Sequence, residues 1–521
     1  MKEERDEART EKIIRKIEEA QEAKTEPGEA EAMIALPKIG KEMRKELGDT
    51  MKVVGSFINK AETFMSVGDF DKAAIEYKNA TKRVNTPALL FNLAVANQLS
   101  GKYEEAISGY SNAIEQKPDF AKAFYNRGLA KINLGDYKGA IVDYDKAIEL
   151  KPDLAGAFNN RGNAKGKLGD YKGAFADFDR AIELYGEKNP EAADVFVNRG
   201  NAKGKLKDYT GAIADYDEAI RLKPDFADAF YNRGNAKGKL ADYKGAFADF
   251  DRAIELYGEK NPEAADVFVN RGLAKYNLAD FKGAFADYDR AIELKPDLAN
   301  AFNNRGNAKY NLADFKGAIA DYDRAIELKP DYAGAFYNRG AVKEGLEDYE
   351  GAIADFDMAI KLKPDYAGAF YSRGYAKDYL GDFKGAIADF DRAIELKPDD
   401  AEAFFNRGNA KGKLGDYKGA IAGYDRAIEL KPDYAEVFNN RGNAKGGLGD
   451  YKGAIADFDE AIRLKPDLAG AFNNRGLAKY YLGDYQGAIA DFDKAIELRP
   501  DFAMAIQNRE FVRKKLKEQG K

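Results

Sequence analysis

A pattern of 34 residues that recurs throughout the chain constrains its fold more than any other feature of the sequence. From Ala121 to Leu154 it reads AKAFYNRGLAKINLGDYKGAIVDYDKAIELKPDL. The pattern restarts at Ala155, Ala193, Ala227, Ala265, Ala299, Ala333, Ala367, Ala401, Ala435 and Ala469. Repeats of this length are single structural units that bury their apolar faces by stacking on their neighbours. We therefore expect the 521 residues to form one array of repeats rather than several unrelated domains.

The repeats divide the chain into four segments. A recognisable copy, residues 87–120, precedes the regular repeats, and a weaker copy precedes that one. We assign a charged helical extension or cap to residues 1–53, a degenerate repeat to 54–86, twelve repeats to 87–502 and a capping helix to 503–521. Within the extension, a charged helix over residues 2–24 is followed by a more apolar segment. The apolar segment caps the first repeat, binds a partner or folds into the molecule's own groove.

Each repeat is predicted to form two helices, as the repeat that starts at Ala155 illustrates. The first helix spans residues 155–168, and Gly169 supplies the turn. Asp170 is placed to cap the second helix, whose apolar residues follow a period of 3.6. Pro152 stops the preceding helix, and Asp153 is expected to cap the next one. Two repeats carry four extra residues, within 185–190 and 257–262, which either lengthen the second helix or bulge as a loop.

The repeat resembles a known family. The residues that carry the resemblance are Phe124-x2-Arg127-Gly128, Ala140-x3-Tyr144, Ala147 and Pro152, and their spacing is similar to that of the tetratricopeptide repeat. The resemblance covers about residues 55 to 502. It implies an all-α, right-handed superhelical solenoid of about 12–13 helix-turn-helix repeats, with the first helices lining the concave surface. Arg127 and Lys131 depart from the Leu and the aromatic residue that the family usually has, and both departures leave the small-residue contacts intact.

An asparagine occupies position six of nearly every repeat, counting Ala121 as position one. These ladder asparagines are Asn126, Asn160, Asn198, Asn232, Asn270, Asn304, Asn338, Asn406, Asn440 and Asn474, with Ser372 as the interruption. Asparagine costs several tenths of a kcal/mol relative to alanine within a helix. Its amide offers a donor and an acceptor together, which matches a peptide backbone. The series therefore predicts a peptide-binding surface, and it resembles the asparagine ladder of the eukaryotic O-linked N-acetylglucosamine transferases. Alternatively, these residues bond neighbouring helices or merely descend from a duplicated ancestor.

Residues beside the ladder are candidates for selectivity in the groove. They are Tyr125, Tyr231, Tyr337, Tyr371 and Phe405 at position five and Asn163, Asn235 and Asn307 at position nine. Drift at an exposed site predicts the same variation. Position twelve is glycine in five repeats and tyrosine in others, such as Gly446 and Tyr480. We interpret the glycines as roomy stretches and the tyrosines as constrictions, although loose selection on an exposed face predicts this pattern equally well.

Charged residues recur as regularly as the asparagines. Arg127 and its copies are expected to pair across helices with Asp143 and its copies, forming a charge ladder between repeats. One repeat has Gly423 in place of the aspartate. The alternative is that these charges are solvated.

Composition excludes several function classes. The chain has no His and no Cys, so it lacks an imidazole base, a thiolate nucleophile and the usual zinc or haem ligands. We expect no catalytic residues, no metal and no cofactor. The 83 Lys and Arg against 89 Asp and Glu leave a net charge of −6, without the basic excess typical of nucleic-acid binders. The apolar runs are too short for a membrane span, and the charged N-terminus lacks a secretory signal, so we expect a cytoplasmic protein.

These observations favour an interaction scaffold rather than an enzyme. We expect it to bind an extended peptide or a segment of a partner protein in the concave groove, without nucleic acid or membrane. A regulatory or recruiting subunit of a separate enzyme complex is the first alternative, and a self-associating scaffold is the second.

Overall fold

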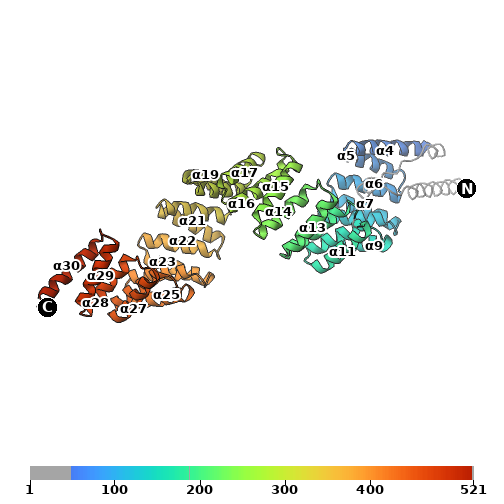
Figure 1. The fold of residues 1–521 in the computed structure, drawn as a ribbon. Coiled ribbons are helices and arrows are strands. Elements are labelled where there is room, and N and C mark those ends of the chain that lie inside the picture. The colour runs from blue at the N-terminus through green and yellow to red at the C-terminus, as the bar shows by residue number, and fades with distance from the viewer. Residues whose placement is uncertain (1–48, 187, 519–521) are drawn as a thin grey trace. The chain divides into compact units, whose positions relative to one another are not determined.

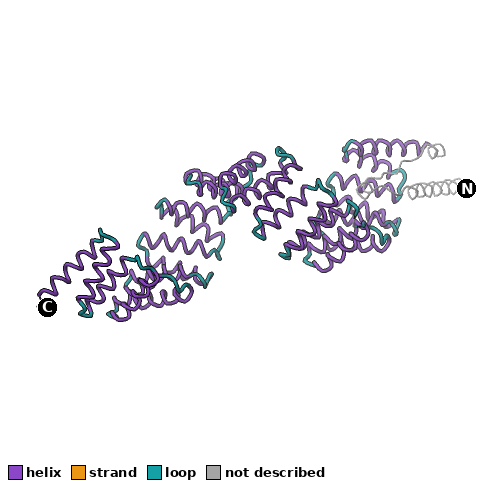
Figure 2. The backbone as a smooth tube through the Cα atoms, in the orientation of Figure 1, coloured by secondary structure: helices purple, strands orange, loops and turns teal. Residues whose placement is uncertain are grey.

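The computed structural model describes residues 49–186 and 188–518, and every regular element in these ranges is helical (Figure 2). Nearly all of the predicted N-terminal extension, residues 1–53, lies outside the described residues. The described ranges contain 27 α-helices and the short 3-10 helix η1 (Pro262–Ala264). Among these residues, no helix combines the length and the apolar character needed to cross a membrane.

The helices form thirteen consecutive hairpins followed by one terminal helix, α30 (Ala503–Glu518). The first helices of the hairpins are α4 (Asp49–Ser66), α6 (Pro87–Leu99), α8 (Ala121–Asn133), α10 (Ala155–Lys167), α12 (Ala192–Lys205), α14 (Ala227–Lys239), α16 (Ala265–Asn277), α18 (Ala299–Asn311), α20 (Ala333–Gly345), α22 (Ala367–Tyr379), α24 (Ala401–Lys413), α26 (Ala435–Gly447) and α28 (Ala469–Tyr481). The second helices are α5 (Phe70–Thr81), α7 (Tyr103–Gln116), α9 (Tyr137–Leu150), α11 (Tyr171–Tyr185), α13 (Tyr209–Leu222), α15 (Tyr243–Tyr257), α17 (Phe281–Leu294), α19 (Phe315–Leu328), α21 (Tyr349–Leu362), α23 (Phe383–Leu396), α25 (Tyr417–Leu430), α27 (Tyr451–Leu464) and α29 (Tyr485–Leu498).

The chain divides into two compact units, one that ends at Ala274 and one that begins at Lys275. Apart from α16, within which the division between the units falls, each helix packs against the next helix along the chain, and most first helices of adjacent repeats also touch. The last three helices illustrate this arrangement, because α28, α29 and α30 lie side by side (Figure 1). Each unit is therefore a stack of helical hairpins, the all-α solenoid that the repeat predicts.

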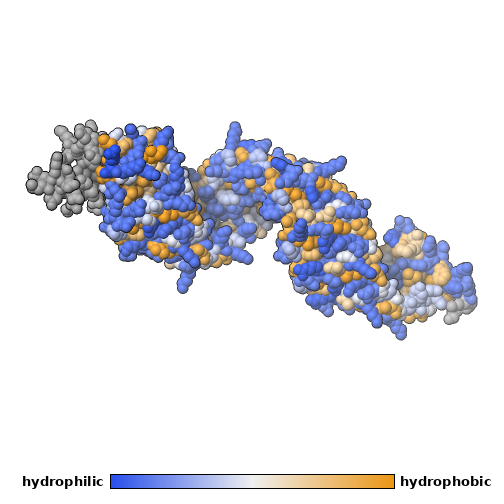
Figure 3. Space-filling view, turned by 180° about the vertical axis from the view of Figure 1, so that it is seen from behind, coloured by the Kyte–Doolittle hydropathy of each residue, from blue (hydrophilic) through white to orange (hydrophobic). Residues whose placement is uncertain are grey.

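Small residues let the two helices of each hairpin approach closely. A Cβ atom added to Gly128 would lie 2.7 Å from a ring carbon of Tyr144, which is fully buried on the second helix. Gly162 stands in the same relation to Phe178 in the next repeat, at 2.8 Å. Buried alanines recur in every repeat, and in several repeats a phenylalanine of the first helix, such as Phe302, is buried as well. Hydrophobic and hydrophilic residues are interspersed over the face shown in Figure 3.

The turn within each hairpin matches the prediction. The side chain of Asp170 accepts a hydrogen bond from the backbone N–H of Gly173 and caps α11, and Gly169 adopts φ +85°. A Cβ atom on Gly173 would lie 2.2 Å from Asp170 Oδ2, so this close approach of the capping carboxylate favours glycine, whereas in α5 Asp69 caps Lys72 at a longer 3.2 Å. In five repeats a residue other than glycine takes the left-handed turn position, for example Ala313 at φ +61°.

The cap expected between repeats is wrong. Leu154, not Asp153, is the N-cap residue of α10, and no side-chain hydrogen bond caps this helix. The reason is that Leu154 packs against the apolar cluster of the preceding helices, so the N-cap position falls one residue after the aspartate and the helix begins at Ala155. Where an aspartate replaces this leucine, as Asp400 does, it caps its helix by accepting hydrogen bonds from two backbone N–H groups.

The four-residue insertions form mainly loops. Helices α11 and α15 have 15 residues, one more than the other regular second helices. Gly186 and Gly258 end them with φ +87° and +89°. After Gly258 the chain continues through a loop and η1 into α16.

Candidate functional site

In the regular repeats other than the one with Gly423, an arginine and a lysine of the first helix hold a buried aspartate of the second helix, as the repeat that starts at Ala155 shows. Arg161 Nε donates to Asp177 Oδ2 at 2.9 Å, and its Nη2 donates to Oδ1 at 2.6 Å. Lys165 Nζ lies 2.8 Å from the same carboxylate, whose side chain is 5% exposed. The predicted pairing of arginine with aspartate is therefore present. It lies within one repeat, however, and not between repeats as expected.

A different aspartate makes the connection between repeats. Arg161 Nη1 donates to Asp145 Oδ1 of the preceding repeat at 2.7 Å. Asp145 stands two residues after the buried aspartate of its own repeat, so the helical twist turns it toward the next hairpin. Partial burial by itself would lower the pKa of Arg161. The hydrogen bonds and charges of Asp177 and Asp145 have the larger combined effect, so the pKa of Arg161 lies above its usual value. This aspartate is not among the residues predicted from the sequence, although it recurs with the same period.

The ladder asparagines also connect neighbouring repeats. Asn406 Nδ2 donates to the hydroxyl of Tyr371 at 2.8 Å, and Asn338 Nδ2 donates to Asn303 Oδ1 at 3.0 Å. Asn160, Asn198, Asn270 and Asn474 donate in the same way to Tyr125, Asn159, Tyr231 and Asn439. The acceptor is in each case the variable residue at position five of the preceding repeat. Bonding between neighbouring helices, one of the alternatives for this series, is thus present in the structure.

Several ladder positions depart from this contact. Asn440 donates instead to Asn409 Oδ1 at 2.9 Å, and Asn126 is buried. The side chain of Asn232 makes no hydrogen bond with any described residue, and position five of the preceding repeat is Val197, which offers no polar group. Asn304 Oδ1 accepts from its neighbour Asn303 at 3.2 Å. The contact therefore depends on a polar side chain at position five.

The aromatic residues at position five also contact the core of their own repeat. The rings of Tyr125, Tyr231, Tyr337, Tyr371 and Phe405 lie 5.8–6.2 Å, centroid to centroid, from the aromatic ring of the second helix. Position nine is bonded in several repeats, since Asn235 Oδ1 accepts from Asn270 and Asn307 Oδ1 accepts from Tyr322. The side-chain amide of Asn163 makes no hydrogen bond with a described residue.

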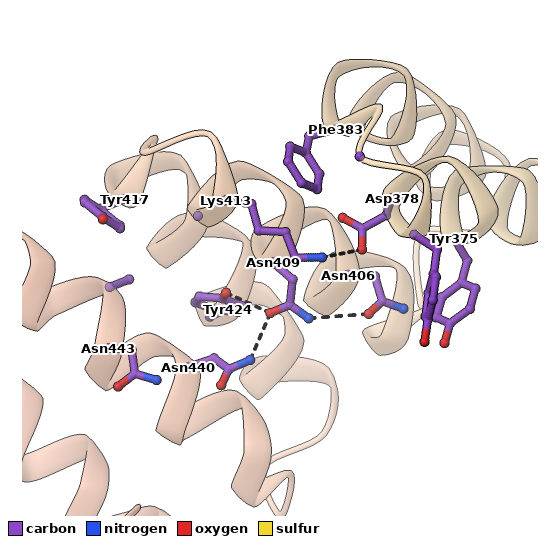
Figure 4. A pocket seen from close by; sticks show the side chains of 14 residues that line it. Tyr375, Asp378, Phe383, Asn406, Asn409, Lys413, Tyr417, Tyr424, Asn440 and Asn443 are labelled. Atoms are coloured by element: carbon purple, nitrogen blue, oxygen red, sulfur yellow. Dashed lines mark hydrogen bonds and ion pairs between the residues drawn. The ribbon is translucent and has the colours of Figure 1, made fainter. Parts of the chain in front are cut away.

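Ladder residues of the second unit line an open cavity of about 900 Å³ (Figure 4). Asn406 and Asn440 contribute amides, and Asn409 lies between them, hydrogen-bonded to both. Tyr375 and Tyr379 form an aromatic wall, and their side chains are 38% and 62% exposed. These two tyrosines are not among the groove residues predicted from the sequence, although they occupy positions nine and thirteen of the first helix α22.

A smaller cavity of about 190 Å³ lies in the next repeats of the same unit. Its lining includes Asn443, Gly446, Asn474 and Tyr481. A Cβ atom on Gly446 would meet nothing within 4 Å, so no packing contact requires a glycine at this position. Open space beside Gly446 is compatible both with a roomy stretch for a ligand and with loose selection on an exposed face, so the interpretation stays a prediction.

Comparison with known proteins agrees with this architecture. Family models described as TPR repeat match residues 99–135, 200–240, 280–312, 314–347, 379–415 and 412–449. Models described as tetratricopeptide repeat match residues 58–110, 121–154, 154–189, 227–260, 333–366, 435–468 and 469–502. No curated protein matches the chain.

Three solved structures illustrate the similarity. YrrB, described as a TPR protein with an unusual peptide-binding site, is 26% identical over 36% of this chain and 97% of its own, with a TM-score of 0.33. MamA is 26% identical over 33% and 93%, with a TM-score of 0.31. The APC/C hetero-tetramer Cut9-Hcn1 is 14% identical over 90% and 98%, with a TM-score of 0.43. The family-model matches cover most of the described helices, and the chain belongs to the tetratricopeptide repeat family.

Proposed function

We propose that the chain is a non-catalytic scaffold that binds an extended segment of a partner protein along its first helices. The tetratricopeptide repeats support a role in protein–protein interaction. The observation that carries the more specific proposal is the cavity of about 900 Å³ that Asn406 and Asn440 border. Amide groups beside open space can bond to a peptide backbone whatever the peptide's side chains are.

The bonds between repeats leave part of each amide available. An asparagine amide has two N–H donors and an oxygen with two lone pairs. Asn406 uses one N–H on Tyr371, and its oxygen accepts one bond, from Asn409 at 3.5 Å. Asn443 borders both cavities, and its side-chain amide makes no hydrogen bond with a described residue. The bonds fix the orientation of the ladder amides before a ligand arrives, which lowers the entropic cost of binding.

The aromatic wall suits the side chains of such a segment. Tyr379 stacks on Tyr349 with ring centroids 4.5 Å apart, and Tyr375 lies 6.2 Å from Tyr379. Exposed rings held in this way bury apolar area at low conformational cost when a partner covers them. The tyrosines then supply contact energy, while the asparagines supply the grip on the backbone.

The test is affinity capture followed by direct titration with the captured segment as a synthetic peptide. We compare the wild type with the triple variant Asn406→Ala, Asn440→Ala and Asn474→Ala. The control is Lys384→Ala, Lys418→Ala and Lys452→Ala, three exposed residues on the second helices of the consecutive repeats 367–400, 401–434 and 435–468, which line neither cavity. We expect the asparagine variant to bind the peptide at least tenfold more weakly and the lysine variant to bind it normally. Equal binding by all three proteins would exclude the ladder as the binding surface.

A further inference from the structure

A contact between repeats of the second unit shows how a carboxylate is held at the end of the first helices. Lys413, the last residue of α24, places Nζ 2.6 Å from Oδ2 of Asp378 in α22 (Figure 4). Asn311 makes the equivalent contact, because its Nδ2 donates to the hydroxyl of Tyr276 at 2.8 Å. In both pairs a side chain at position thirteen reaches the side chain at position twelve of the preceding repeat.

In the first unit the same positions lack the acceptor. Lys205 and Lys239 occupy position thirteen of α12 and α14, and Gly166 and Gly204 occupy position twelve of the preceding repeats. Both lysines are exposed and have no partner among the described residues. A Cβ atom on either glycine would meet nothing within 4 Å. The place that Asp378 fills in the second unit is therefore open beside these lysines.

Neighbouring amides of the first unit present donors to the same surface. Asn201 Oδ1 accepts from the hydroxyl of Tyr216 at 2.8 Å, and Asn235 Oδ1 accepts from Asn270 at 3.0 Å. Each of these oxygens already accepts one hydrogen bond, and the side-chain N–H groups of both amides donate to no described residue. Position nine lies one helical turn before position thirteen, so the amides and the lysines share one side of each helix. A surface of N–H and ammonium donors matches an acceptor of negative charge.

We propose that Lys205 and Lys239, above Gly166 and Gly204, bind the carboxylates of an acidic peptide segment. Each aspartate or glutamate of the ligand takes the place that Asp378 holds beside Lys413. The inference rests on the proposed function, because it names the chemistry of the segment that the first unit accepts. The lysines at position eleven do not contribute, since each is already neutralised by a buried aspartate, as Lys203 is by Asp215 at 2.8 Å.

The surface fits a peptide better than a nucleic acid. Single-stranded nucleic acids gain much of their affinity from bases that stack on aromatic side chains. Positions nine, twelve and thirteen of α12 and α14 are asparagine, glycine and lysine, which offer no ring for stacking.

The first experiment compares two labelled peptides on the full-length protein by fluorescence anisotropy. One peptide has four repeats of Glu-Gly-Ser, and the other has four repeats of Gln-Gly-Ser, which is nearly isosteric but uncharged. We expect the glutamate peptide to bind about fivefold more tightly at low ionic strength, with the difference shrinking in high salt. Equal affinities at low salt would overturn the inference.

The second experiment restores the missing acceptor within the protein. The variant Gly166→Asp and Gly204→Asp copies the pairing of Asp378 with Lys413, so we expect it to lose the preference for the glutamate peptide. The matched control, Gly166→Asn and Gly204→Asn, has side chains of the same size without charge and is expected to keep the preference. If both variants keep it, the lysines are not the carboxylate site.

The third experiment removes the lysines and uses a charge-matched control. We expect Lys205→Gln with Lys239→Gln to abolish the preference and Lys172→Gln with Lys244→Gln, two exposed lysines of the second helices, to retain it. Equal loss in both variants would indicate a general charge effect and overturn the inference. Tighter binding of an oligothymidylate than of the glutamate peptide, dependent on Lys205, would also overturn it.

The outcomes separate this inference from the proposed function. The asparagine variant that tests the proposed function alters only the second unit, whereas the peptide preference depends on residues of the first unit. If partner capture requires the ladder asparagines but the two test peptides bind equally, the proposed function is supported and the inference about Lys205 and Lys239 is wrong. If the asparagine variant binds every partner segment as tightly as the wild type does, the proposed function itself is wrong.

Discussion

Asp177 accepts two hydrogen bonds from the guanidinium of Arg161, at 2.6 and 2.9 Å, while its own side chain is only 5% exposed. Lys165 binds the same carboxylate, so one buried anion holds two cations that lie one turn apart on the first helix. Two like charges at this spacing would otherwise repel each other. The arrangement explains why a family position that is usually apolar tolerates arginine in nearly every repeat of this chain.

Removal of the negative charge of Asp177 should destabilise the repeat that contains it. We expect Asp177→Asn to destabilise the local structure by about 2–4 kcal/mol, because Arg161 and Lys165 lose their buried counter-charge. Hydrogen exchange of the amides in α10 and α11 measures this loss, which suits a long solenoid better than a global unfolding curve. The control is Asp145→Asn, whose side chain is 56% exposed and should cost less than about 1 kcal/mol. Similar protection in both variants would contradict this account.

The repeat that lacks the buried aspartate offers the reverse test. Gly423 takes its place, and Nε of Arg407 is buried there without a hydrogen-bond partner among the described residues. We expect Gly423→Asp to stabilise this repeat by about 1–2 kcal/mol, since it restores the charged hydrogen bonds. The new Cβ would lie 3.1 Å from the carbonyl oxygen of Phe404, so a small shift reduces the gain. Gly423→Asn is the uncharged control, and an equal gain from it would argue against the charge effect. Exchange rates of α24 and α25 provide the measurement.

Backbone strain at a turn can be relieved by replacing its left-handed residue with glycine. Ala313 has φ +61°, in the left-handed region that costs a residue with a Cβ atom about 1 kcal/mol. We expect Ala313→Gly to raise the stability of its repeat by about 0.5–1 kcal/mol and Gly415→Ala, at φ +80°, to lower stability by a similar amount. Exchange protection of the helices on either side of each turn reports the effect. Changes of the same sign in the two variants would contradict the assignment.

Local features of the repeat could be read from sequence because each depends on residues close together in the chain. The first helix predicted over residues 155–168 spans Ala155–Lys167 in the structure. The turn at Gly169 and the cap by Asp170 follow from backbone geometry within one hairpin. The cap by Asp153 failed because Leu154 packs against the preceding helices, a contact that local pattern does not reveal.

Contacts between repeats could not be predicted, since the period of 34 residues does not specify how the hairpins stack. Asp145 recurs as regularly as Asp143, and only the stacking shows that it binds the arginine of the next repeat. The ladder asparagines were recognised as a row, but their bonds to position five depend on the rotamers of two neighbouring helices. Whether these amides bind a peptide stays a prediction.

Stability should depend on pH through one residue of the second unit. Burial raises the pKa of Glu344 to about 7. Between its unfolded value of about 4.5 and pH 7, the folded state binds more protons than the unfolded state, so stability falls as the pH rises through this window. We expect Glu344→Gln to remove this loss, which at pH 8 amounts to roughly 1–3 kcal/mol. Thermal unfolding at pH 5 and pH 8 measures it, and the exposed Glu350→Gln is the control. Identical pH dependence in the wild type and Glu344→Gln would contradict the prediction.

The roomy stretch at Gly446 can be closed with the side chain that the next repeat carries. Gly446→Tyr copies Tyr480, which occupies position twelve one repeat later, and nothing within 4 Å opposes a Cβ atom there. The helix should not be weakened, because tyrosine has the higher helix propensity. The new ring should fill the cavity of about 190 Å³ beside Asn474 and lower the affinity for a captured partner segment about tenfold. Gly446→Ala keeps the cavity open and should bind normally. Unchanged binding by the tyrosine variant, with its helical content intact by circular dichroism, would mean that the segment does not pass over this part of the first-helix surface.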